Sequence, residues 1–108
     1  MPFLLFTEDF NRSALYEALG SIVTTADWRG AIGYLRCHDD VAIFCELSSA
    51  RAIDVLRAVM RDEELKKVRV IGIDMDPETT ATARVMGLQE IVPEGRIDAI
   101  RDMIAAPL

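Results

Sequence analysis

The stretch VAIFCELSS, residues 41–49, decides the fold of this chain of 108 residues. Its first five residues suit a buried strand, and Glu46 and Leu47 lead directly into two serines that are typical helix caps. Such a continuous apolar run favours a central parallel strand that is covered on both faces. The stretch therefore predicts the middle strand of an α/β sheet, with the carboxylate of Glu46 at its end.

Outward from this stretch, the chain repeats the same succession of a short apolar run and a helical pattern, which predicts five βα units in a single domain, residues 1–108. The expected strands are residues 3–6, 21–25, 41–47, 68–74 and 90–92. The expected helices are residues 9–19, 27–37, 48–60 and 76–87, followed by a last helix with Ile97, Ile100 and Ile104 on one face. In the first helix, the apolar stripe expected to face the core is Phe10, Ala14, Leu15, Ala18 and Leu19.

The composition narrows the classes of function. A net charge of −6 and a pI near 4.7 argue against binding to a phosphate backbone, so we expect no nucleic-acid partner. The apolar runs are too short to span a bilayer, and no secretory signal is recognisable, so we expect a cytoplasmic protein without a membrane contact. Cys37 and Cys45 are expected to be reduced thiols. The run from Cys37 to Asp40 is better explained as a solvated turn than as a zinc site.

Acidic residues gather where the predicted strands end, at the edge where ligands bind in open α/β sheets. Two carboxylates about 5 Å apart repel by roughly 3 kcal/mol at an effective dielectric of about 20, so something at this edge must offset the repulsion. The alternatives are an arginine partner, for which Arg51 and Arg96 are the candidates, a raised pKa, splaying into water, or a divalent cation. The acids at this edge are Glu8, Asp9, Glu46, Asp74, Asp76 and Glu94.

With its five βα units, its acidic edge and the stretch ARVMGLQEIVPEG at residues 83–95, the chain resembles the receiver domain of bacterial two-component response regulators over essentially its whole length. The resemblance implies a three-layer, doubly wound (βα)5 fold of the flavodoxin-like, CheY-like kind. It also implies a five-stranded parallel sheet of order 2-1-3-4-5.

The family's working residues have been replaced at almost every matching position. The phosphoacceptor aspartate becomes Glu46, and the Mg²⁺-binding acidic pair becomes Thr7 and Glu8, or at best Glu8 and Asp9. The family's hydroxyl becomes Asp74, its lysine Glu94, the proline after that lysine Gly95, and its aromatic Ile91. Because phosphoryl transfer depends on positioning and on neutralising charge, we expect a degenerate pseudo-receiver that is not an enzyme and is not phosphorylated at Glu46.

The expected function is a regulatory module that works independently of phosphorylation, through a protein partner or a homodimer, with no cofactor. Whether its fixed conformation matches the active or the inactive receiver state stays open, as does an effector domain beyond residue 108. Two alternatives also remain. One is a receiver phosphorylated at a nonstandard acid. The other is a sensor of a cation or small ligand, in which Mg²⁺ bound by Glu8, Asp9 and Glu46 is the weaker possibility. The family's output face here carries Thr79, Thr80, Thr82, Arg84, Glu90, Ala99, Met103 and Ala106.

Overall fold

The computed structural model describes residues 3–19, 22–38 and 41–96. Five parallel strands form one sheet in the order β2-β1-β3-β4-β5, which confirms the α/β class and the strand order that the resemblance implies. The strands are β1 (Phe3–Phe6), β2 (Ile22–Thr25), β3 (Ala42–Leu47), β4 (Arg69–Asp74) and β5 (Ile91–Pro93). The helices are η1 (Phe10–Leu19), α1 (Trp28–Cys37), α2 (Ala50–Arg61), η2 (Glu63–Leu65) and α3 (Pro77–Val85).

Side chains at the predicted caps start three of the helices. The carboxylate of Asp27 accepts a hydrogen bond from the backbone N–H of Arg29, and the hydroxyl of Ser49 accepts one from Arg51 N–H. Asp76 caps α3, with Pro77 in its first turn. These starts agree with the sequence prediction within a residue or two, whereas the last predicted helix lies outside the described residues.

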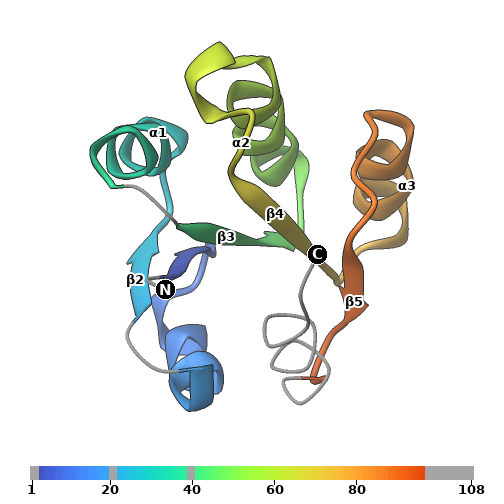
Figure 1. Ribbon diagram of the computed structural model, residues 1–108. Coiled ribbons are helices and arrows are strands. Elements are labelled where there is room, and N and C mark those ends of the chain that lie inside the picture. Colours follow the sequence, from blue (N-terminus) through green and yellow to red (C-terminus); the bar gives the residue numbers. More distant parts are fainter. Residues whose placement is uncertain (1–2, 20–21, 39–40, 97–108) are drawn as a thin grey trace.

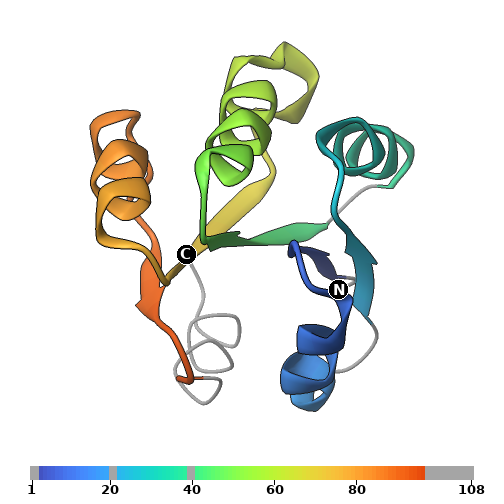
Figure 2. The same cartoon turned by 180° about the vertical axis from the view of Figure 1, so that it is seen from behind.

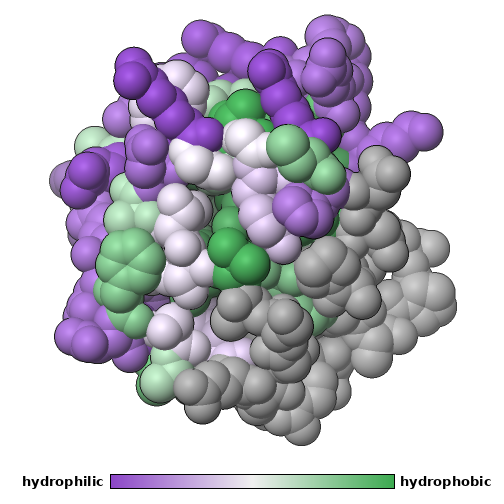
Figure 3. Space-filling view, turned by 90° about the vertical axis from the view of Figure 1, so that its left-hand side faces the viewer, coloured by the Kyte–Doolittle hydropathy of each residue, from purple (hydrophilic) through white to green (hydrophobic). Residues whose placement is uncertain are grey.

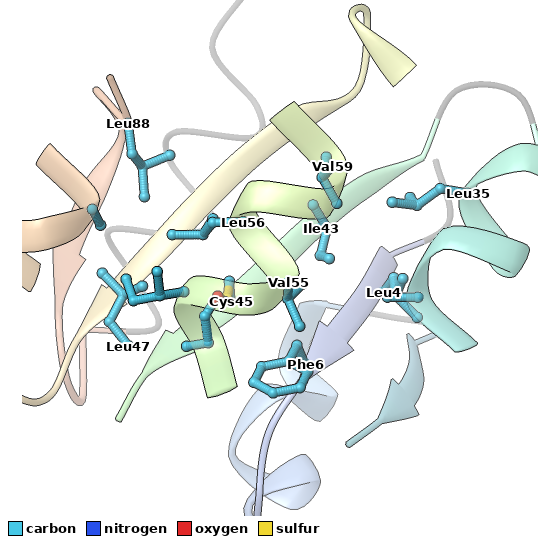
Figure 4. Packing of buried hydrophobic residues seen from close by; sticks show 14 of the residues in the cluster. Leu4, Phe6, Leu35, Ile43, Cys45, Leu47, Val55, Leu56, Val59 and Leu88 are labelled. Carbon is cyan, nitrogen blue, oxygen red and sulfur yellow. Dashed lines mark hydrogen bonds between the residues drawn. The ribbon is translucent and has the colours of Figure 1, made fainter. Parts of the chain in front are cut away.

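Three helices, α1, α2 and α3, cover one face of the sheet, as both ribbon views show (Figures 1 and 2). Beneath α2, the side chains of Val55, Leu56 and Val59 pack over β3 (Figure 4). Ile43 and Cys45 of β3 are completely buried there. This apolar layer fixes the position of β3, and with it the position of Glu46 near the end of that strand.

The opposite face carries η1, which differs from the helix that the sequence predicts (Figures 1 and 2). Its winding is 3-10, so the 3.6-residue periodicity behind the predicted apolar stripe does not apply. Phe10 and Leu15 are exposed, with Phe10 at 57%, and Tyr16 is the buried side chain instead. The stripe prediction is therefore wrong for Phe10, Ala14 and Leu15, and the side chains of Ala18 and Leu19 lie outside the described set.

Within the part of the chain that the structure describes, no helix combines the length and the apolar character needed to cross a membrane. Both cysteines are free thiols, Cys37 exposed and Cys45 buried, as the sequence predicts.

Candidate functional site

Glu46 is the second-last residue of β3 and is almost completely buried, with 1% of its surface exposed. Three side chains donate hydrogen bonds to its carboxylate. The Thr7 hydroxyl is 2.5 Å from Oε1, the Tyr16 hydroxyl is 2.8 Å from Oε2, and Arg12 Nε is 2.7 Å from Oε2. We call Glu46, Thr7, Arg12 and Tyr16 the Glu46 network. A carboxylate offers about four acceptor positions, so these donors occupy most of its capacity.

Arg12 and Tyr16 both come from η1, four residues apart, and reach the end of β3 across the sheet edge. The hydrogen bond to Glu46 raises the pKa of Arg12, and the guanidinium also lies 3.7 Å from an oxygen of Glu94. Burial, reinforced by the hydrogen bond to Glu46, raises the pKa of Tyr16 above its ordinary value. At neutral pH the network therefore holds a guanidinium cation and a protonated phenol against Glu46.

Thr7 follows β1 directly and is completely buried. Its hydroxyl accepts a hydrogen bond from the backbone N–H of Asp9 at 3.2 Å. Two acceptors lie within reach of its single hydrogen, the carbonyl oxygen of Asp9 at 3.1 Å and the nearer carboxylate oxygen of Glu46 at 2.5 Å. The resemblance implies a metal-binding acid at position 7, and the residue found there, Thr7, instead donates a hydrogen bond to Glu46.

The other acids at this edge have local partners. Glu8 is exposed and accepts a hydrogen bond from Ser49, and Asp9 accepts one from the backbone N–H of Asn11. Asp74 accepts a hydrogen bond of 2.9 Å from the Thr80 hydroxyl. The side-chain hydrogen bond from Thr79, together with the backbone one, lowers the pKa of Asp76. The crowding expected from the sequence is relieved by separate local contacts.

The residues do not fit the Mg²⁺ site that the resemblance implies. Across residues 3–19, 22–38 and 41–96, no three acidic, histidine or cysteine side chains are placed so that they could hold a metal ion. Glu8, Asp9 and Glu46, the weaker alternative named from the sequence, therefore do not form such a group.

The arginine that relieves Glu46 is not one of those predicted. Arg51 and Arg96 were the candidates, and Arg12 takes the role. Arg12 lies 34 residues from Glu46 in the chain, and Tyr16 lies 30 residues away. No α-helical spacing signals this pair, because η1 is wound as a 3-10 helix, in which residues four apart do not lie on one face.

The predicted output face is only partly on the surface. Thr79 and Thr80 are buried and turned to Asp76 and Asp74, so their assignment to that face is wrong. Glu90 is half-buried in a bidentate ion pair with Arg69, with an N–O distance of 2.7 Å. Thr82 and Arg84 are exposed on α3, and Ile91, which takes the aromatic position, is half-buried. Ala99, Met103 and Ala106 lie outside the described residues.

A five-stranded parallel sheet of this order, with helices on both faces, matches the fold of solved response regulator receiver structures. Over 99% of its length the chain is similar to the bacteriophytochrome response regulator AtBRR, with a TM-score of 0.72 and 17% identity, covering 94% of that chain. Similarity to the bacteriophytochrome response regulator RtBRR extends over 99% of this chain and 78% of that one, with a TM-score of 0.71 and 16% identity.

A response regulator receiver protein from Dyadobacter fermentans DSM 18053 gives a TM-score of 0.73 at 19% identity, covering 96% of this chain and 94% of that one. Scans against protein-family models and against curated proteins find no match. At these identities the likeness establishes the fold alone.

The raised pKa of Tyr16 predicts a loss of stability at alkaline pH. Its ordinary value is 10.0, and the folded protein keeps the phenol proton at a pH where the unfolded chain has released it. This contribution is complete below about pH 10 and declines as the pH rises further. Urea unfolding followed from about pH 8 to about pH 11 should therefore show a falling midpoint in the parent protein and a shallower fall in Tyr16→Phe.

The comparison of slopes isolates Tyr16, because burial also raises the pKa of the Cys45 thiol and both proteins contain that cysteine. Parallel slopes in the two proteins would contradict the protonated, hydrogen-bonded phenol.

Proposed function

We propose that this chain is a cytoplasmic, non-enzymatic, receiver-like signalling module in or derived from a two-component system, which acts through a protein partner without being phosphorylated. The observation that carries the proposal is the Glu46 network. The carboxylate at the position of the receiver phosphoacceptor is buried, and the chain's own donors already engage it.

Burial argues against attack on a phosphoryl donor. Nucleophilic transfer needs the reacting oxygen close to the phosphorus and in line with the leaving group. With 1% of its surface exposed, Glu46 offers no approach unless Arg12 and Tyr16 leave first. Their departure would leave a buried carboxylate without its ion pair, at a cost of several kcal/mol.

The surrounding charge argues in the same direction. Glu94 occupies the position of the family's lysine, and it lies beside Arg12 instead of providing a cation for a phosphoryl group. Arg12 is thus shared between two carboxylates. A phosphoryl dianion would add two negative charges to a site where the guanidinium of Arg12 already faces two carboxylates.

The Glu46 network also supports a fixed conformation. It joins the ends of β1 and β3 to η1 through four side chains, so these three elements are held in one arrangement at the edge of the sheet. A module held in this way presents one surface to its partner at all times.

Incubation with acetyl phosphate and Mg²⁺, followed by intact-mass measurement, tests the proposal. We expect less than about 5% of the chain to gain the mass of a phosphoryl group, because nucleophilic attack by Glu46 is blocked. Glu46→Asp in the Arg12→Met background serves as the comparison, since it restores an aspartate and removes the ion pair. A stoichiometric gain in the parent protein that Glu46→Gln abolishes would overturn the proposal in favour of a working receiver.

A further inference from the structure

A shallow groove lies between α1 and α2, on the outer side of the helical layer. It encloses about 290 Å³, and none of its lining residues is a partner of Glu46. Figure 3 shows the side of the molecule that carries α1 and β2, where hydrophilic side chains project along the upper part of the face around smaller apolar areas. The groove is lined by Trp28, Asp54, Arg57, Ala58 and Arg61.

Trp28, the first residue of α1, gives the groove an apolar wall. It is 42% exposed, an unusual position for the largest side chain. The guanidinium of Arg29 lies 5.3 Å from the centre of the indole ring, a cation–π distance that holds positive charge over this surface. Tryptophan and arginine are the residues most often found where binding energy concentrates in protein interfaces.

The charge of the groove is opposite to that of the molecule. The chain carries a net charge of −6, yet Arg57 and Arg61 line the groove four residues apart on α2. Asp54 is the one acid among the lining residues, and its pair with Arg57 is long, at 3.5 Å, and exposed at both ends. Such pairs are weak and exchange readily with other partners. Among the described residues, Arg61 has no ion pair.

We propose that this groove binds an acidic segment of a partner protein that carries an apolar anchor side chain. Aspartate or glutamate in the segment pairs with Arg57 and Arg61, and the apolar side chain packs on Trp28. The charge complementarity at the groove selects an acidic segment over a basic one, because two arginines and a single acid line it. The inference rests on the proposed function, since it identifies the surface through which the module acts.

Trp28 is the only tryptophan in the chain, so its intrinsic fluorescence reports directly on the groove. The probe is a synthetic peptide of about twelve residues, without tyrosine or tryptophan, in which a Leu-Phe pair is flanked by glutamate and aspartate. A second peptide has lysine at every acidic position. We expect a saturable change in Trp28 emission with the acidic peptide, weakened by added salt, and no saturation with the basic one.

The double variant Arg57→Glu, Arg61→Glu should bind the acidic peptide at least about tenfold more weakly, because two attractive contacts become repulsive. Arg84→Glu is the matched control. It reverses one exposed arginine on α3, outside the groove, and should leave the affinity within about twofold. Circular dichroism verifies that all variants are folded.

Equal affinity for the two peptides, equal loss in the groove and control variants, or no saturation would each overturn the inference. Saturable quenching by ATP without binding of the acidic peptide would also overturn it, in favour of a nucleotide site. A failure of the groove to bind the acidic peptide is distinguishable from failure of the proposed function, because the phosphorylation assay does not depend on Arg57 or Arg61.

Discussion

Replacing Arg12 by methionine is expected to lower the free energy of unfolding by about 2–4 kcal/mol. The substitution leaves the carboxylate of Glu46 buried without its cation, and breaking a buried pair in this way costs far more than losing a surface ion pair. The loss should fall toward the lower end of the range for a broken buried pair, because about a quarter of the Arg12 side chain is exposed and Thr7 and Tyr16 still donate to Glu46. Urea unfolding at neutral pH measures the effect.

A double-mutant cycle identifies the cause. Glu46→Gln removes the negative charge that pairs with Arg12. Arg12→Met should therefore lower the free energy of unfolding by at least about 1 kcal/mol less in that background than in the parent. Arg84→Met, which removes an exposed arginine from α3, should change stability by no more than about 0.5 kcal/mol. Additive losses in the cycle would contradict the ion pair between Arg12 and Glu46.

Replacing Phe44 by alanine is expected to cost about 3–5 kcal/mol, the range for deleting a completely buried phenylalanine. Phe44 lies in β3 on the face that η1 covers, with its ring 5.4 Å from that of Phe3 and 6.4 Å from that of Tyr16. The substitution therefore opens a cavity beneath the tyrosine that binds Glu46. Thermal or urea unfolding gives the loss.

Phe10→Ala provides the control, since the same deletion is made on η1 where the ring is mostly in water. Its expected cost is no more than about 0.5 kcal/mol. Comparable losses at Phe10 and Phe44 would contradict the placement of η1, because they would require Phe10 to face the core as its helical periodicity predicts.

The strands and most helices were predictable because the signals that form them are local. The apolar run of β3 and the caps at Asp27, Ser49 and Asp76 each act over a few residues, so the sequence shows them directly. The winding of η1 was not predictable in this way. A 3-10 helix places different residues on its inner face from those that an α-helical periodicity selects.

The site was predictable in part. The sequence placed Glu46 at the end of the central strand and several acids along one edge, which follows from strand polarity alone. It did not identify Arg12 and Tyr16, because these residues lie 34 and 30 residues from Glu46 in the chain and meet it only through the packing of η1. The predicted repulsion among carboxylates is therefore replaced at Glu46 by an internal ion pair.

The donors of the chain itself occupy the carboxylate of Glu46, and beryllofluoride tests this most directly, since it binds to an accessible receiver carboxylate as a phosphoryl group would. With beryllofluoride and Mg²⁺, ¹⁹F NMR of the parent protein should show only resonances of the free fluoride species. Protein-bound resonances that require Mg²⁺ and disappear in Glu46→Gln would contradict the account.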